Sequence, residues 1–229
     1  FNETKNNQLF INLPETYNWG EEEKLNNEFL SLGFYLSSHP LNLFLDVLNE
    51  IQIIKSSEIL ENPSNYTRKN IKLSGLVFKL QKRQSPRVKW ATFQLNDLGC
   101  NCEITLYSDT LLNYEHHLNQ KKPILIDAEL KSDSNQGIRI IAKRIMLLEE
   151  YILQNKFDLI LTLNDQSSII DINLITQSLK SGKSNIFIKF IVDKKIIQIN
   201  ICENVKLSTS LLDDFSKIKN INNIKYSLN

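Results

Sequence analysis

The sequence predicts a mainly β protein with an α+β part: a five-stranded barrel that follows a short helical segment and precedes a small β-α-β-β-α-β domain. Two observations predict this class. Between residues 68 and 148, runs that alternate apolar and polar residues are arranged as three strands, one helix and two strands. From residue 149 onwards, runs in which apolar and polar residues alternate are interspersed with runs whose apolar residues have helical spacing. Because 41% of the 229 residues are hydrophobic, the chain can bury the cores of one or two domains.

Residues 1–20 mix Asn, Glu, Pro and Thr without periodicity, which predicts an extended linker. Within this linker, the two apolar residues Leu9 and Phe10 follow the polar residues Asn6, Asn7 and Gln8. Two adjacent apolar side chains in a polar segment can dock into a pocket of a partner protein without any domain having to unfold. The alternative is that they pack the linker onto its own domain.

Residues 21–67 predict a helical connector between the linker and the barrel. Apolar residues at helical spacing form two groups, which are Leu25, Phe29 and Leu32, and then Leu41, Phe44, Leu45 and Leu48. The first group follows an acidic turn, which suits the positive end of a helix dipole. Pro40 suits the first turn of the second helix, where its missing N–H costs nothing, and His39 is expected to close that helix start.

Residues 68–148 predict the barrel. The inward-facing apolar positions of its five strands are Ile71, Leu73 and Val77, then Ala91, Phe93 and Leu95, then Cys102, Ile104 and Leu106, then Ile124, Ile126, Ala128 and Leu130, and finally Ile138, Ile140 and Ala142. A hairpin turn at 97–101 joins the second and third strands, and a helix over 111–118 separates the third from the fourth. This order is that of an OB-fold. Gly75 lies where the first strand of a small barrel must bend sharply.

Residues 149–229 predict the C-terminal α+β domain, after a helical connection near Met146. Strands are expected over 159–163, 186–190 and 197–201, with a last short strand near Ile224. One helix is expected through Ile172 and Leu179, closed by Gly182, and a second through Leu211 and Phe215. Together these elements give the β-α-β-β-α-β order.

A net charge of +1 hides a basic run on the first two barrel strands. The run consists of Lys79, Lys82, Arg83, Arg87 and Lys89, and no acidic residue follows it until Asp97. The outer face of these strands is where an OB-fold holds single-stranded nucleic acid. There, basic side chains neutralise phosphates, while Trp90 and Tyr107 can stack on bases. The alternative is a solvated hairpin in which Trp90 closes the barrel.

Other candidate sites fail on spacing. Gly182, Lys183 and Ser184 resemble the end of a phosphate-binding loop, but Gln177 stands where that loop needs its first Gly. Cys100 and Cys102 lack a second pair of ligands, so zinc is not expected. His116 and His117 are adjacent on a helix and are therefore expected to diverge. The paired acids Asp213 and Asp214 are expected on a solvated helix face. We therefore expect no catalytic residue, no metal site and no cofactor in this chain.

The segment Leu32-Gly33-Phe34-Tyr35, followed by His39-Pro40-Leu41, resembles the C-terminal region of the alpha subunit of bacterial DNA polymerase III. In that family a helix ends in Gly and an aromatic pair, and His-Pro-Leu opens the next helix. The family usually has Gly at the position of Ser38. The resemblance extends to the run from Trp90 to Asp97, which aligns with a family strand, and to Glu103 at its expected offset.

The resemblance implies a non-catalytic part of a replicative polymerase. Its OB-fold barrel would bind single-stranded template DNA. Residues 6–10 would form a sliding-clamp motif of the type Gln-x-x-Leu-Phe, with Asn6 at the Gln position. The terminal domain would bind the tau subunit of the clamp loader, within the polymerase III holoenzyme. The parent subunit would be a DNA-directed DNA polymerase, a nucleotidyltransferase that uses magnesium and deoxynucleoside triphosphates, with its metal-binding aspartates outside this chain.

Three cysteines, an odd number, favour a reducing compartment, and no apolar run approaches the length of a membrane span. We therefore expect a cytoplasmic protein without a membrane partner. Two other functions stay open at this point. One is a free-standing OB-fold module that binds RNA or tRNA, and the other is a protein-binding scaffold whose barrel binds no nucleic acid.

Overall fold

A computed structural model describes residues 21–32, 35–133, 137–164, 168–192 and 195–228. The described residues form two compact units, one that ends at Ser37 and one that begins at Ser38. The predicted linker, with Asn6, Gln8, Leu9 and Phe10, lies outside the described residues.

The first unit contains helix α1 (Glu21–Leu32) and the segment that follows it. The Glu28 carboxylate accepts hydrogen bonds from the Leu36 and Ser37 backbone N–H groups, at 3.0 and 2.9 Å, and from the Ser37 hydroxyl. These hydrogen bonds, chiefly those from Ser37, hold the pKa of Glu28 below its ordinary value. The Phe29 and Tyr35 rings stack with their centroids 5.0 Å apart. The predicted helix is therefore present, and the chain folds back on it.

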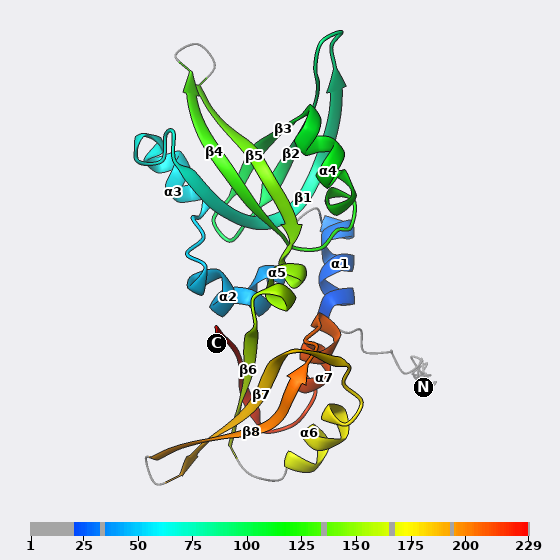
Figure 1. The fold of residues 1–229 in the computed structure, drawn as a ribbon. Coiled ribbons are helices and arrows are strands. Elements are labelled where there is room, and N and C mark those ends of the chain that lie inside the picture. Colours follow the sequence, from blue (N-terminus) through cyan, green and yellow to red (C-terminus); the bar gives the residue numbers. More distant parts are fainter. Residues whose placement is uncertain (1–20, 33–34, 134–136, 165–167, 193–194, 229) are drawn as a thin grey trace, which may run out of the picture. The chain divides into compact units, whose positions relative to one another are not determined.

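The barrel of the second unit has five strands and one helix (Figure 1). They are β1 (Asn70–Gln84), β2 (Lys89–Asn96), β3 (Asn101–Tyr107), α4 (Ser108–Leu118), β4 (Ile124–Asp133) and β5 (Gly137–Leu147). The strands close in the order β1-β2-β3-β5-β4, with β3 and β5 parallel and every other pair antiparallel. The predicted OB-fold is thereby confirmed. The last strand runs through Met146, so the helical connection begins at Leu148, two residues later than expected.

Gly75 allows the sharp bend that closes the barrel. Strand β1 pairs with β4 up to Gly75 and with β2 from Leu76 onwards. A Cβ atom on Gly75 would lie 2.5 Å from the Asn96 carbonyl oxygen and 2.7 Å from the Leu95 side chain. Only a residue without a side chain fits here, because β2 passes so close to the bend.

The helical connector consists of η1 (Pro40–Phe44), a 3₁₀ helix, then α2 (Leu45–Glu50), α3 (Ser56–Glu61) and the short η2 (Pro63–Asn65). His39 is the N-cap residue of η1, and its Nδ1 accepts a hydrogen bond from the Leu41 N–H at 3.1 Å, as expected. Leu41, Phe44 and Leu48 are buried, but Leu45 is exposed because the 3₁₀ turn shifts it off the common face.

The C-terminal domain begins after α5 (Leu148–Gln154) and contains a four-stranded sheet with two helices. Its elements are β6 (Phe157–Leu163), α6 (Ile169–Thr176), β7 (Ser181–Val192), β8 (Lys195–Val205), α7 (Thr209–Ser216) and β9 (Ile221–Leu228). The sheet order is β8-β7-β6-β9, and the parallel pair β6–β7 is joined by α6. The predicted β-α-β-β-α-β order is present.

The expected helix end at Gly182 is wrong. Helix α6 ends at Thr176, and Gly182 lies in β7. A Cβ atom on Gly182 would lie 2.4 Å from the Val205 carbonyl oxygen, so this glycine permits close approach of β7 and β8.

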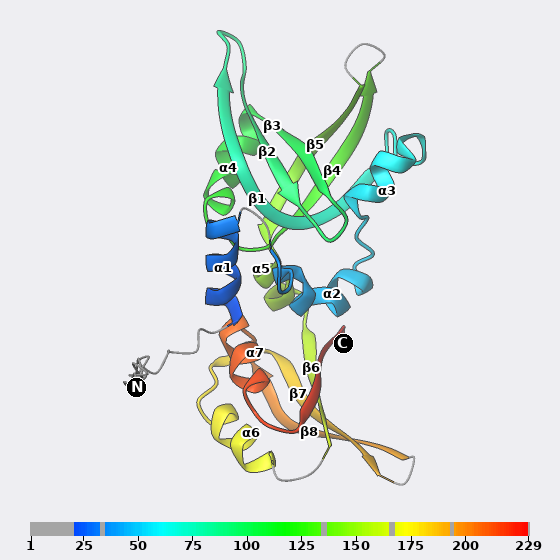
Figure 2. The ribbon, with the colours of Figure 1, turned by 180° about the vertical axis from the view of Figure 1, so that it is seen from behind.

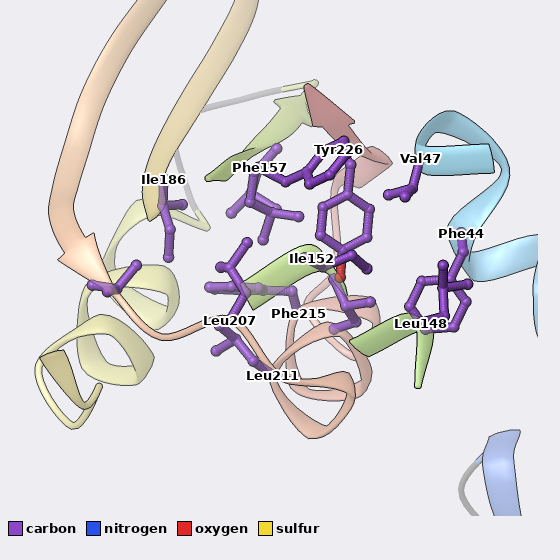
Figure 3. Packing of buried hydrophobic residues seen from close by; sticks show 14 of the residues in the cluster. Phe44, Val47, Leu148, Ile152, Phe157, Ile186, Leu207, Leu211, Phe215 and Tyr226 are labelled. Carbon is purple, nitrogen blue, oxygen red and sulfur yellow. The ribbon is translucent and has the colours of Figure 1, made fainter. Parts of the chain in front are cut away.

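Two hydrophobic cores stabilise the second unit. One fills the barrel and includes Ile59 of α3. The other joins the connector residues Phe44 and Val47 to α5 and to the C-terminal sheet (Figure 3). In this second core the Phe44 and Tyr226 rings stack with their centroids 6.3 Å apart. The connector therefore contributes to both cores, α3 to the barrel and α2 to the sheet.

Candidate nucleic-acid interface

The basic run lies on the β1–β2 hairpin, which projects beyond the barrel on the same side as the β4–β5 hairpin (Figure 1). Strand β1 bulges between Phe78 and Gln81, where Lys79 has a φ of 53°. The bulge adds one residue to β1 and so reverses which side chains face outward beyond it. The turn at the tip is closed by a 2.8 Å hydrogen bond from the Ser85 N–H to the Val88 carbonyl.

One row of side chains crosses the outer face of the three strands near the tip of the hairpin. Arg83 pairs with Trp90 in the β1–β2 register, and Trp90 pairs with Tyr107 in the β2–β3 register. Residues paired in this way in antiparallel strands project from the same face. Their neighbours Ala91 and Leu106 are fully buried in the barrel, so the row faces outward. Tyr107 is 37% exposed and Trp90 is half-buried.

This row combines the two chemical groups that a single strand of nucleic acid needs. The indole and phenol rings offer flat surfaces on which bases can stack, and the guanidinium group can bind phosphate. The Arg83 Nη2 donates a hydrogen bond to the Gln81 side chain at 3.1 Å, which steadies it on the outer face. The site is an open surface, as contact with an extended polymer requires.

Two of the predicted basic residues lie on the opposite face of the hairpin. Lys82 pairs with Ala91, and Lys89 pairs with Gln84, so both project from the inner side. Lys82 forms an ion pair with Glu115 of α4. The basic run therefore does not form one patch, because the strand divides it between two faces and part of its charge is neutralised.

The remaining two predicted residues lie away from the row. Lys79 is exposed at the bulge, and Arg87 is exposed in the turn at the tip. Arg87 can still reach a strand that passes over the tip, since its side chain is long and has no hydrogen-bond or ion-pair partner among the described residues. Lys79 lies toward the base of the hairpin.

Sequence reasoning missed two residues of the outer face, Phe78 and Glu103. They lie two rows away, beyond the outward row of Gln81, Thr92 and Thr105, and Gln94 pairs with both. Glu103 adds a negative charge, so a phosphate chain is favoured near Arg83 and disfavoured toward the base of the strands. Alternation indicates that Glu103 faces outward, but no sequence pattern gives its distance from Arg83.

A buried polar network fixes the lower end of β2. The Asp97 carboxylate, only 5% exposed, accepts hydrogen bonds from the N–H groups of Ser56 (2.5 Å), Gly99 (2.6 Å) and Cys100 (2.9 Å). Next to it, the His39 Nε2 is 2.7 Å from the Asn96 Oδ1. Since Nδ1 of His39 already accepts from Leu41, Nε2 is the donor to Asn96. This network attaches the connector to the β2–β3 hairpin and so holds the outer face in place.

The cysteines, histidines and paired acids that the sequence analysis excluded as metal or catalytic sites each contact neighbouring residues in the structure. Burial raises the pKa of Cys102 to about 12, and the sulfur of Cys100 lies 3.1 Å from the Ser56 hydroxyl. Asp214 pairs with Lys217 at 3.5 Å. The prediction that His116 and His117 diverge is wrong, because their ring centroids lie 3.9 Å apart. His117 is buried, and its Nε2 lies 3.8 Å from the Glu150 carboxylate.

The described residues were compared with the requirements of a metal site and of a membrane span by their side chains and helix lengths. These residues include no group of three or more His, Cys, Asp or Glu side chains placed to hold a metal ion. Among the helices that the structure describes, none is long and apolar enough to cross a lipid bilayer.

Comparison with known proteins identifies relatives along most of the chain. The alpha subunit of DNA polymerase III from Buchnera aphidicola is 27% identical over 223 residues, which is 94% of this chain and 18% of that protein. The same subunit from Rickettsia felis is 27% identical over 133 residues, 58% of this chain and 11% of that protein. This chain is similar to the C-terminal region of the DNA polymerase III alpha subunit. The chain spans less than a fifth of the length of these alpha subunits.

No model of a protein family matches the chain. Among solved structures, a mitochondrial single-stranded DNA binding protein from S. cerevisiae, Rim1, is similar with a TM-score of 0.30 and 13% identity, over 34% of this chain and 92% of that chain. The second OB-fold domain of replication protein A from Methanococcus maripaludis is similar with a TM-score of 0.29 and 13% identity, over 36% of this chain and 87% of that chain.

Proposed function

We propose that this chain is a DNA-binding and partner-binding part of a replicative polymerase, and that its barrel holds the single-stranded template. The observation that carries the proposal is the outward row of Arg83, Trp90 and Tyr107 on a closed OB-fold barrel. The similarity to the alpha subunit supports DNA rather than RNA as the natural ligand. In this account bases stack on the two rings while phosphates pass Arg83 and Arg87.

Removal of positive charge from the β1–β2 hairpin tests this proposal. Replacing Lys82, Arg83 and Arg87 together with Ala is expected to weaken binding of a labelled single-stranded oligonucleotide and to make the dependence of affinity on salt less steep. Because Lys82 is paired with Glu115, Lys82→Ala alone is expected to have the smallest effect of the three. Lys183→Ala, which removes an exposed charge from the C-terminal sheet, is the control. Unchanged binding by the triple variant would refute the assignment.

The competing nucleic-acid function is a free-standing module that binds RNA. Competition between DNA and RNA strands of one sequence separates the two functions, because the polymerase account predicts that DNA competes at least as well as RNA. Absence of salt-sensitive binding to both strands would instead favour a protein-binding scaffold.

The partner contacts are a second part of the proposal. Leu9 and Phe10, behind Asn6 and Gln8, are proposed to dock into the sliding clamp, because two adjacent apolar side chains in a polar segment suit a pocket of the clamp. A clamp pull-down in which Leu9→Ala and Phe10→Ala bind as well as the parent would refute this. The C-terminal domain is proposed to bind the tau subunit of the clamp loader, and removal of residues 149–229 is expected to abolish capture of tau.

The whole polypeptide is proposed to be a cytoplasmic DNA-directed DNA polymerase of the polymerase III holoenzyme. Its magnesium-binding aspartates are proposed to lie outside this chain, and this chain alone is expected to incorporate no nucleotide. A primer-extension assay with magnesium and deoxynucleoside triphosphates tests this, and extension by the chain alone would contradict it.

A further inference from the structure

A bulge in strand β5 turns two successive basic side chains to the outside of the barrel. Consecutive residues of β4, Asp127 and Ala128, pair with residues of β5 that are two apart, Arg144 and Ala142, so Lys143 is an additional residue. Lys143 and Arg144 are both exposed, whereas their neighbours along the strand are buried. In a regular strand, successive side chains alternate between the two faces. The bulge therefore adds a positive charge to the outer surface of β4 and β5.

Arg144 lines a pocket between the outer face of the barrel and α5. The pocket has a volume of about 320 Å³, and its lining includes Lys72, Asp127 and Arg144 from the strands and Tyr151 and Gln154 from the helix. This volume is within the range of sites that hold small molecules. Helix α5 follows β5 directly and lies at the end of the barrel away from the β1–β2 and β4–β5 hairpins (Figure 2). The pocket shares no residue with the outward row near the tip of the β1–β2 hairpin.

The charged side chains around the pocket leave one positive charge uncompensated. A second pocket, of about 550 Å³, shares Lys72, Asp127 and Arg144 with the first and adds Glu129 and Lys143. The Lys143 ammonium lies 2.9 Å from the Glu129 carboxylate, and this hydrogen bond is the main reason why the pKa of Glu129 lies below its ordinary value. Lys72 pairs with Asp127 at 3.5 Å. Arg144 forms no hydrogen bond or ion pair with another residue that the structure describes, so its charge is available to a ligand.

Two neutral donors line the same pocket. The Tyr151 hydroxyl and the Gln154 side-chain amide form no hydrogen bond with another residue in the described part of the chain. The Tyr151 ring packs against Phe157, with the ring centroids 6.2 Å apart, which holds the phenol in place. A guanidinium group with O–H and N–H donors beside it has the chemistry that binds an oxyanion.

We propose that this pocket binds the carboxylate group of a ligand, with Arg144 as the anchor and Tyr151 and Gln154 as further donors. The planar guanidinium group binds a carboxylate through two parallel hydrogen bonds. A carboxylate carries a single negative charge, which balances the uncompensated charge of Arg144. Asp127 and Glu129 disfavour a phosphate group, which carries more negative charge. The carboxylate belongs to a free acid or to an acidic residue of a peptide.

An NMR titration of the isotope-labelled full chain at constant ionic strength tests the proposal. The probes are sodium acetate, glutamate capped at both ends, and capped glutamine, which has the same shape without the charge. Both acids are expected to shift the Arg144 Nε–H and Tyr151 amide signals saturably, and capped glutamine is not. Equal affinities for the two acids would identify a free acid as the ligand, and tighter binding of capped glutamate would identify a peptide. The proposal would be overturned by the absence of a saturable shift, by equal shifts with capped glutamine, or by inorganic phosphate binding as tightly as the acids.

Substitution of the anchor tests its role. Arg144→Gln is expected to raise the dissociation constant of the tighter acid at least about tenfold, followed at the Tyr151 amide, because a charged hydrogen-bond donor is lost. Arg144→Lys, which keeps the charge without the planar fork, is expected to bind with intermediate affinity. Lys131→Gln removes an exposed charge of β4 outside both pockets and is the matched control, expected to bind as the parent does. Since Arg144 is exposed, its variants are expected to fold, and a folded Arg144→Gln variant that binds as tightly as the parent would overturn the proposal.

Discussion

At the scale of single residues, Asp97 has the largest structural consequence. Its carboxylate satisfies three backbone donors from two segments of the chain, and it does so while almost fully buried. Since hydrogen bonds to a charged group contribute about 1.5–3 kcal/mol each and the donors would be left without partners, Asp97→Ala is expected to lower the free energy of unfolding by about 3–5 kcal/mol.

Urea denaturation of Asp97→Ala against the parent measures this loss. The control is Glu61→Ala, which removes an exposed carboxylate at the end of α3 and is expected to change the free energy of unfolding by less than about 0.5 kcal/mol. Equal stability of the two variants would mean that the network does not hold the hairpin.

His39 predicts a pH dependence of stability. Its pKa lies below the ordinary value, chiefly because burial disfavours the charged ring, while the hydrogen bond to Asn96 and the charge of Asp97 act in the opposite direction. The unfolded chain therefore binds more protons than the folded chain once the pH falls below about 6.5. The free energy of unfolding is expected to decrease as the pH is lowered from this value toward the pKa of the folded state.

An NMR titration of the His39 ring and urea denaturation at several pH values check this expectation. Burial lowers the pKa of His117 too, so the contribution of His39 is taken as the difference between the parent and His39→Gln. A ring that titrates at or above its ordinary pKa, or a variant with the same pH dependence as the parent, would contradict the account.

At the scale of elements, Gly75 determines whether β1 can bend and so pair with both β4 and β2. A methyl group here would overlap the Asn96 carbonyl and the Leu95 side chain. Gly75→Ala is therefore expected to lower the free energy of unfolding by about 1–3 kcal/mol or more, measured by urea denaturation. Gly137→Asn is the control, because Asn tolerates the φ of 74° found there and is expected to cost little. A stable Gly75→Ala variant would show that β1 bends in another way.

The strands of the barrel could be predicted from sequence because alternation is a local pattern. Ala91, Phe93 and Leu95 face inward as their spacing indicates. The division of the basic run could not be predicted, since it depends on the bulge at Lys79 and on the register between strands. Both are properties of the pairing between β1 and β2, which the alternation within one strand does not specify. The sequence therefore predicts one basic patch, whereas the structure divides these residues between two faces.

At the scale of the whole chain, residues of the connector pack into both hydrophobic cores. The sequence of the connector does not show which residue packs into which core. Phe44 packs with the C-terminal sheet, whereas Ile59 packs with the barrel. Phe44→Ala is expected to cost about 3–5 kcal/mol and Ile59→Ala about 2–5 kcal/mol, because each removes fully buried side-chain volume. Hydrogen exchange is expected to show lost protection mainly in β6 and β9 for the first variant, and in β1 and β2 for the second.

The two variants are controls for each other. If both lowered the protection of the same amides, the two cores would unfold as one unit, and the division of the connector between them would have no energetic meaning.

The central claim is that the outer face at Trp90 contacts single-stranded nucleic acid, and one measurement tests it most directly. Fluorescence anisotropy with a labelled single-stranded oligonucleotide compares the parent with Trp90→Ala and Trp90→Phe, after thermal unfolding has established that all three are folded. Since stacking on an aromatic ring contributes about 1–3 kcal/mol per base, Trp90→Ala is expected to weaken binding by about 5- to 100-fold, and Trp90→Phe is expected to recover much of it. Equal affinity of the parent and a folded Trp90→Ala variant would contradict the account.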